Sequence, residues 1–88
     1  MNDHWFVYIV QCADNSLYTG ITTDIERRLN EHNHHDKLGA RYTRHRRPVR
    51  LVYQEQLSSH SQALCREHAI KKLKRKEKEQ LIYRTPKN

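Results

Sequence analysis

Residues 6–10 (Phe-Val-Tyr-Ile-Val) and residues 17–21 (Leu-Tyr-Thr-Gly-Ile) are two apolar runs separated by a short polar segment. Aromatic and β-branched runs joined in this way predict a β-hairpin, although the turn sequence Asn-Ser is a weaker signal than Asn-Gly. The first strand, expected over 4–12, is apolar on both faces and therefore suits the centre of a small sheet. Each strand carries a tyrosine, Tyr8 or Tyr18, where an aliphatic side chain would pack equally well.

A helix is predicted directly after the second strand. Thr23, followed three residues later by Glu26, has the sequence of a capping box and is expected to begin this helix. The helix should run to about residue 32 or 33, and one stripe at helical spacing then contains Ile25, Arg28, Leu29 and His32. Arg27 points to the opposite side, so the periodicity selects Arg28 as the inward arginine, with His32 one turn further along.

The middle of the chain is polar and then returns to a strand pattern. Residues 33–47 are rich in histidine and arginine, and a loop this long in so small a domain is usually functional. Residues 49–53 (Val-Arg-Leu-Val-Tyr) follow Pro48 and predict a third strand at an edge of the sheet, where a proline is tolerated.

Two further helices are predicted in the last third of the chain. Ser59 and Gln62 have the spacing of a second capping box, so a helix should run from there to about residue 74. The apolar face of this helix consists of Ala63, Leu64, Ile70 and Leu73. Glu67 lies within that face, where a carboxylate is costly unless it finds a cation or hydrogen-bond donors. A last helix over 75–84 follows, and its docking side chains are expected to be Leu81, Ile82 and Tyr83.

These elements predict a single domain over residues 1–88, with its core in about 4–83, and an α+β fold in the order β-β-α-β-α-α. A chain of 88 residues buries only about 60–65% of its unfolded surface, so the core is expected to be small.

The formal net charge of +7 is the strongest compositional feature. Such a charge predicts attraction to a polyanion, most often nucleic acid and sometimes ribosomal RNA or an anionic membrane surface.

Cys12 and Cys65 form no CxxC pair or disulfide framework, which fits a reduced, cytoplasmic setting with each thiol as a small apolar filler. No signal segment and no apolar run near 18 residues is present, so neither secretion nor a membrane span is expected.

The hairpin and the helices are expected to bring together five side chains with useful chemistry: Tyr8, Tyr18, Arg28, His32 and Glu67. Hydrolysis of a phosphodiester needs a nucleophilic water, a base and positive charge at the transition state. A tyrosinate beside cations is a workable base, because positive charge lowers the pKa of a phenol from about 10. Arg28 offers a permanently charged fork for phosphate. Glu67 could hold Mg²⁺, with water and phosphate as the other ligands.

The hairpin and the arginine-bearing helix resemble the GIY-YIG nuclease family. The first family triad corresponds to Phe6-Val7-Tyr8 and the second to Tyr18-Thr19-Gly20, and the resemblance covers about residues 4–83. It implies a three-stranded antiparallel sheet flanked by helices. Small stand-alone bacterial members of the family, without an added DNA-binding domain, are the most similar in plan.

The resemblance also implies roles for particular residues. The family arginine stands ten residues after the second-triad tyrosine, which gives Arg28, and the residue one turn later is His32. The metal-binding glutamate on a later helix corresponds to Glu67. Two departures stand out: Phe6 replaces the first glycine, and the asparagine that many members carry after the glutamate has no clear counterpart before Asn88.

A second group of residues is expected to contact nucleic acid: Arg41, Tyr42, Arg44, Arg46, Arg47, Lys71 and Lys74. Arginines interleaved with an aromatic residue suit a groove that follows a strand of nucleic acid. Tyr42 could instead pack down and anchor its loop, and the lysines could form a solvated face.

The sequence therefore predicts a DNA endonuclease that uses Mg²⁺ or Mn²⁺, with branched or single-stranded DNA among its possible substrates and a small-molecule substrate not expected. The second hypothesis is a catalytically weak or silent nucleic-acid-binding module of the same fold. The third is a histidine-rich metal-binding or protein-interaction domain. Structural alternatives are strand tyrosines that only pack, an ion pair between Arg28 and Glu67, and His32 as a cap of its helix.

Overall fold

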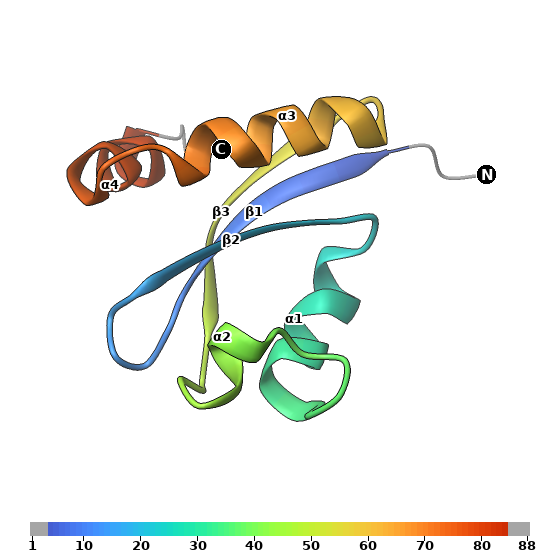
Figure 1. Cartoon of the computed structure of the whole chain (residues 1–88), viewed down its shortest axis with the longest axis vertical. Helices are drawn as coiled ribbons and strands as arrows, with labels where there is room; N and C mark the ends of the chain where they lie inside the picture. The colour runs from blue at the N-terminus through green and yellow to red at the C-terminus, as the bar shows by residue number, and fades with distance from the viewer. Residues whose placement is uncertain (1–3, 85–88) are drawn as a thin grey trace.

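The computed structural model describes residues 4–84, so the ends of the predicted domain, 1–3 and 85–88, lie outside the described residues. In chain order the elements are β1 (Trp5–Gln11), β2 (Leu17–Thr22), α1 (Ile25–His34), α2 (Arg41–Arg44), β3 (Arg50–Leu57), α3 (His60–Lys71) and α4 (Arg75–Arg84). The strands form an antiparallel sheet in the order β2-β1-β3, with β1 at the centre (Figure 1). The predicted α+β fold and element order are confirmed, and α2 is a single helical turn within the stretch expected to be a loop.

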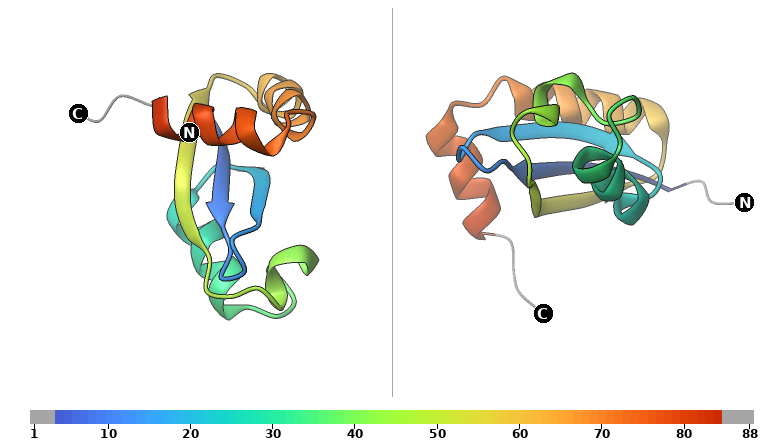
Figure 2. Two further views of the ribbon diagram at one scale, coloured as in Figure 1. Left: turned by 90° about the vertical axis from the view of Figure 1, so that its left-hand side faces the viewer. Right: turned by 90° about the horizontal axis from the view of Figure 1, so that it is seen from below.

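The sheet separates two small apolar clusters. Successive side chains of a strand point to opposite faces. Val7 and Ile9 of β1 pack with Ile70 of α3, whereas Tyr8 and Val10 point to the other face, toward α1. Figure 2 shows α3 and α4 on one side of the sheet and α1 and α2 on the other. Neighbouring residues of β1 therefore belong to different layers. The layer between the sheet and α3 is apolar, and the layer between the sheet and α1 also contains polar groups.

The third strand is longer than the sequence pattern indicates. It continues past Tyr53 to Leu57, and its polar residues Gln54, Glu55 and Gln56 pair with β1. An unpaired backbone N–H or C=O is costly wherever water is excluded, and β1 needs partners on both of its sides. Pairing with the central strand therefore outweighs the weak strand propensity of these polar residues.

The two capping predictions differ in outcome. Ser59 caps α3 as predicted, and its hydroxyl accepts a hydrogen bond from the backbone N–H of Gln62. The cap of α1 is Asp24 and not Thr23, because the Asp24 carboxylate accepts from the backbone N–H of Arg27 at 3.1 Å. The Thr22 hydroxyl in turn accepts from the Asp24 N–H, so the first turn begins one residue later than predicted.

The apolar face of α3 is narrower than predicted. Ala63 and Ile70 are buried against the sheet, but Leu64 is 44% exposed and Cys65 is exposed rather than a buried filler. Cys12 is buried as predicted. The helix ends at Lys71, three residues before the predicted end. Because α3 packs mainly on β1 and β2 of a small sheet, its flanking positions remain in solvent.

The last helix docks through fewer residues than predicted. Leu81 and Ile82 pack on the α3 face of the sheet, as predicted. Tyr83 is 80% exposed, so the prediction that it docks is wrong. Among residues 4–84, no helix is both long enough and apolar enough to cross a membrane.

Candidate active site

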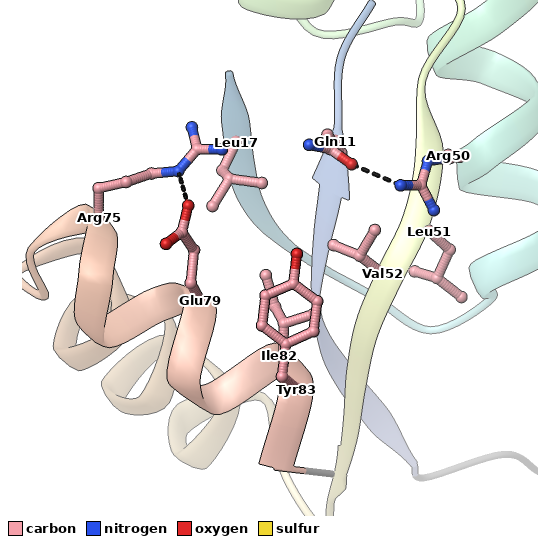
Figure 3. A pocket seen from close by; sticks show the side chains of 9 residues that line it. All are labelled: Gln11, Leu17, Arg50, Leu51, Val52, Arg75, Glu79, Ile82 and Tyr83. Atoms are coloured by element: carbon pink, nitrogen blue, oxygen red, sulfur yellow. Dashed lines mark hydrogen bonds and ion pairs between the residues drawn. The ribbon is translucent and has the colours of Figure 1, made fainter. Parts of the chain in front are cut away.

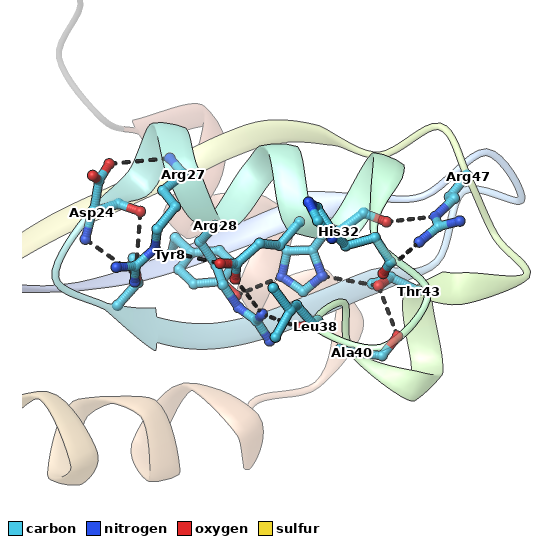
Figure 4. A network of polar contacts seen from close by, with 12 residues as sticks. Tyr8, Asp24, Arg27, Arg28, His32, Leu38, Ala40, Thr43 and Arg47 are labelled. Atoms are coloured by element: carbon cyan, nitrogen blue, oxygen red, sulfur yellow. Dashed lines mark hydrogen bonds and ion pairs between the residues drawn. The ribbon is translucent and has the colours of Figure 1, made fainter.

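Four of the five expected side chains gather on the α1 face of the sheet: Tyr8, Tyr18, Arg28 and His32. Figure 4 shows Tyr8, Arg28 and His32 close together. The Tyr8 hydroxyl lies 2.7 Å from His32 Nε2. The His32 ring makes edge contacts with both tyrosine rings, with centroid separations of 5.8 Å to Tyr8 and 5.4 Å to Tyr18. Tyr8 is 2% exposed and His32 is fully buried, so their hydrogen bond is shielded from water.

Gly20 makes the position of Tyr8 possible. Gly20 pairs with Tyr8 across the two strands, and a Cβ at Gly20 would lie 2.6 Å from the Tyr8 hydroxyl oxygen. No real Cβ tolerates such a contact, so the phenol can lie across β2 only because this residue is glycine. The absence of a side chain at Gly20 therefore lets the Tyr8 ring of the neighbouring strand pack close to the β2 backbone.

Thr43 extends the hydrogen-bonded chain from His32 into α2. Its hydroxyl lies 2.9 Å from His32 Nδ1 and donates to the Ala40 carbonyl at 3.1 Å. Thr43 is fully buried. Sequence reasoning missed this residue, since a threonine among arginines carries no signal for burial. Only the packing of α2 against α1 brings it to the histidine.

The side chain of His32 does not cap α1, so that alternative is wrong. Its ring points inward, and the basic side chain at the end of the helix is Arg47. Arg47 Nε donates to the His32 carbonyl at 2.6 Å, Nη2 donates to the His35 carbonyl at 3.0 Å, and Nη1 pairs with Asp36. Helix C-termini leave carbonyls without intrahelical partners, and a cation is favoured there. Arg47, expected to contact nucleic acid, is thus engaged in structural contacts.

Replacing Arg47 with alanine is expected to lower the free energy of unfolding by about 2–3 kcal/mol, since carbonyls at the end of α1 lose charged donors. Urea denaturation followed by circular dichroism measures this change. The matched control is Arg41→Ala, an exposed arginine of α2 for which a change within about 0.5 kcal/mol is expected. Unchanged stability of Arg47→Ala together with weakened DNA binding would show instead that Arg47 contacts phosphate.

Arg28 is held beside Tyr8 by two acceptors. Its Nη1 donates to Glu31 Oε1 at 2.9 Å and to the Leu38 carbonyl at 2.6 Å. The suggested ion pair between Arg28 and Glu67 is therefore not formed, and the carboxylate partner of Arg28 comes from its own helix. Glu67 pairs with Lys71 one turn along α3, at 3.2 Å.

The pKa values at the site differ from the sequence-based expectation. Burial raises the pKa of Tyr8 to about 12, and the opposing effect of Arg28 is smaller. Arg28 does act to lower this pKa, as expected, but the prediction of a net lowering is wrong because burial has the larger effect. Burial, and then the positive charge of Arg28, lowers the pKa of His32 to about 4. At neutral pH the phenol is protonated and the imidazole is neutral.

Glu67 comes from α3, the helix on the far face of the sheet, which packs on β1 and β2. Burial is the largest cause of the raised pKa of Tyr8, and the negative charge of Glu67 raises it further by a smaller amount. In residues 4–84 no group of three or more His, Cys, Asp or Glu side chains forms a metal site, which removes the support for a histidine-rich metal centre. A half-buried single carboxylate fits Mg²⁺ only where water and substrate phosphate complete the coordination.

The aromatic ring of Tyr42 contacts other side chains of the protein, although the residue remains 38% exposed. It stacks on Tyr18 with a centroid separation of 5.8 Å and an interplanar angle of 22°, and the Arg46 guanidinium lies 4.0 Å from its centroid. Arg46 also donates to the Tyr42 carbonyl and to Asp14. These contacts favour the alternative in which Tyr42 anchors α2, and they engage Arg46 within the fold.

The other expected nucleic-acid contacts are more open. Arg41 and Lys74 are exposed, and Lys71 is 51% exposed while it pairs with Glu67. Arg44 is partly buried, and its Nε has no hydrogen-bond partner among the described residues. Exposed cations are therefore present on α2 and at the end of α3, two elements that lie well apart in the fold (Figure 1).

A cavity of about 400 Å³ lies elsewhere, between α4 and the ends of the strands (Figure 3). Its lining includes Leu17, Val52 and Ile82, which belong to the apolar cluster on the α3 face. It therefore opens on the face of the sheet opposite Tyr8 and is not part of the candidate site.

Comparison with known proteins places this geometry in a family. The model of the GIY-YIG catalytic domain matches residues 4–80. UPF0213 protein DP2720 of Desulfotalea psychrophila is 62% identical over 78 residues, which cover 89% of this chain and 70% of that protein. UPF0213 protein HQ_3675A of Haloquadratum walsbyi is 57% identical over 81 residues, which cover 92% of this chain and 89% of that protein.

Solved structures agree with these matches. The solution NMR structure of UPF0213 protein BH0048 from Bacillus halodurans is 43% identical, with a TM-score of 0.60 over 93% of this chain and 85% of that one. The solution NMR structure of EF2693 from E. faecalis is 40% identical, with a TM-score of 0.64 over 100% of this chain and 96% of that one. The family model over most of the chain, the similar relatives and the similar folds agree with one another, and the chain belongs to the GIY-YIG family.

Proposed function

We propose that this chain is a metal-dependent endonuclease that hydrolyses phosphodiester bonds of DNA. The observation that carries the proposal is the buried hydrogen bond from Tyr8 to His32 with the Arg28 guanidinium beside it. The match to a GIY-YIG catalytic domain supports a nuclease, and the net charge of +7 supports a nucleic-acid substrate. The cytoplasmic setting remains a prediction from the cysteine usage.

Tyr8 and His32 can together remove a proton from the attacking water. As the water oxygen bonds to phosphorus, its O–H bond breaks and the Tyr8 oxygen takes the proton. The Tyr8 hydroxyl hydrogen passes at the same time to His32 Nε2, 2.7 Å away. This concerted transfer avoids a free tyrosinate, which a phenol pKa of about 12 would make scarce. It leaves His32 as a transient imidazolium, and because burial lowers the pKa of His32 to about 4, the ring then releases this proton to solvent. The leaving oxygen takes its proton from solvent.

Arg28 supplies the positive charge. Because Glu31 and the Leu38 carbonyl are both bound through Nη1, the guanidinium is fixed before a substrate arrives. The Arg28 side chain is 23% exposed, so N–H groups of the guanidinium other than those on Nη1 can donate to a phosphate. A preoriented cation stabilises developing negative charge without a reorganisation cost at the moment of reaction.

Glu67 would hold the divalent metal, Mg²⁺ or Mn²⁺. When bound, such an ion neutralises charge on a non-bridging oxygen of the phosphate. To hold the ion Glu67 would have to give up its pair with Lys71, and the lysine would then be free to contact a neighbouring phosphate. Arg41 and Arg44 on α2 and Lys74 after α3 extend the contact along the backbone. So few cations, directed at phosphates, predict low sequence specificity.

The test is cleavage by the purified protein of supercoiled plasmid, single-stranded oligonucleotide and a branched junction, each with Mg²⁺, Mn²⁺ or EDTA. Metal-dependent nicking of at least one substrate is expected, and EDTA should stop it. The absence of product from every substrate with either metal, while DNA binding is intact, would refute the endonuclease.

The second candidate is a nucleic-acid-binding module with weak or no catalysis. Two observations favour it: the raised pKa of Tyr8 and the lack of an asparagine counterpart after Glu67. This candidate predicts that binding weakens steeply with salt and that no substrate is cut. The cleavage panel above therefore separates the two candidates.

A further inference from the structure

We propose that Thr43 is a positioning residue that holds the His32 imidazole in the tautomer protonated on Nδ1, so that Nε2 is free to accept the Tyr8 proton. The hydrogen-bond chain itself is independent of the reaction. Its consequence for cleavage rests on the proposed function.

The direction of the chain follows from its last acceptor. The Ala40 carbonyl can only accept, and the Thr43 hydroxyl donates its one hydrogen to it at 3.1 Å. The same carbonyl accepts from the backbone N–H groups of Thr43 and Arg44 at the start of α2, which fixes its position. The Thr43 oxygen then has only lone pairs left for His32. Nδ1 must therefore be the donor across the 2.9 Å contact.

A neutral imidazole carries a single proton, so a proton on Nδ1 leaves Nε2 as an acceptor. Nε2 lies 2.7 Å from the Tyr8 hydroxyl, which then donates. The opposite tautomer would make Nδ1 an acceptor, and the Thr43 hydroxyl would have to turn its hydrogen away from the Ala40 carbonyl to reach it. It would also direct an N–H at the phenol, which could then not pass on a proton.

Burial excludes the usual substitute for such a contact, which is water. Thr43 and His32 are fully buried and Tyr8 is 2% exposed. The charged and titratable groups that act on the His32 ring are Tyr8, Tyr18, Arg28, Glu31 and Arg47. Burial, and then the charges of Arg28 and Arg47, disfavour a second proton on the resting ring, and the carboxylate of Glu31 only partly offsets them. Before the reaction the ring is therefore neutral, and its single proton is on one nitrogen or the other.

The position of Thr43 depends on how α2 is attached. Tyr42 next to it stacks on Tyr18 of β2, and Arg46 binds Asp14 in the hairpin turn at 3.1 Å. The stretch expected to be a nucleic-acid-binding loop thus also carries the group that orients the histidine.

Long-range ¹H–¹⁵N NMR of the imidazole nitrogens tests the inference in the protein without DNA or metal. In the wild type, the His32 Nδ1 shift is expected to be that of a protonated nitrogen and the Nε2 shift that of an unprotonated one. Thr43→Ser keeps the hydroxyl and should preserve this pattern. Thr43→Val keeps the volume without a hydroxyl and should move the ring toward the Nε2-protonated form. A wild-type spectrum with Nε2 protonated overturns the inference, whether or not the valine variant folds, and so does a folded Thr43→Val that keeps the wild-type pattern.

Cleavage kinetics provide the second readout. Thr43→Val should cut DNA at least about tenfold more slowly at saturating substrate, with unchanged DNA affinity, and Thr43→Ser should restore most of the rate. Equal rates for the valine variant and the wild type would refute the positioning role. If the wild type cuts no DNA at all, the endonuclease proposal fails, and the tautomer measurement still decides the inference.

Discussion

Replacing Glu67 with glutamine is expected to abolish metal-dependent cutting of DNA, with a loss of at least about a hundredfold, while the fold and DNA binding persist. The reason is that the amide keeps the shape of the side chain but loses the charge that would hold the divalent ion. Plasmid nicking with Mg²⁺ and with Mn²⁺ measures the loss. A fluorescence-anisotropy titration with labelled DNA measures the binding.

The stability of Glu67→Gln separates a functional carboxylate from a structural one. The only ion pair of Glu67 within residues 4–84 is the one to Lys71, which is half-exposed, and such pairs contribute about 0.3–0.5 kcal/mol. The free energy of unfolding should therefore change by less than about 0.5 kcal/mol. Glu79→Gln is the matched control, because Glu79 forms the same kind of pair with Arg75 on α4, away from Tyr8. A Glu67→Gln variant that cuts like the Glu79→Gln control would refute the metal role.

Replacing Tyr8 with phenylalanine is expected to slow cleavage by about 10²–10⁴-fold, since the ring would remain and the proton path would not. His32 Nε2 would lose its partner, which should also lower the free energy of unfolding by about 1–2 kcal/mol. Single-turnover cleavage at saturating DNA, with chemical denaturation of the same samples, measures both effects.

Tyr18→Phe is the comparison that identifies the base. Tyr18 contacts His32 and Tyr42 through its ring, so loss of its hydroxyl should have a much smaller effect on the rate. A large loss in Tyr18→Phe with near-normal cutting by Tyr8→Phe would assign the base to Tyr18. That result would refute the proton path through His32.

Local rules were sufficient for most of the fold. Alternation and β-branching identified the hairpin and its buried central strand, and the capping signal at Ser59 identified the start of α3. Helical periodicity alone turned Arg28 and His32 toward the sheet, because the spacing of side chains around a helix follows from its backbone geometry. These predictions succeeded because each depends on neighbours within about one turn or one strand.

The properties of the site depend on contacts between distant segments, which local patterns do not contain. The Tyr8 hydroxyl meets His32 because Gly20 on the next strand leaves room, and Thr43 reaches the same ring from α2. Positive charge near a phenol was a sound reason to expect a lower pKa for Tyr8, but burial has the larger effect and raises it. The sequence by itself determined the strands, the three longer helices and the inward direction of Arg28 and His32, but not α2 or the burial of Thr43. Tertiary packing alone decided which groups lose their water, and desolvation determines where the protons reside.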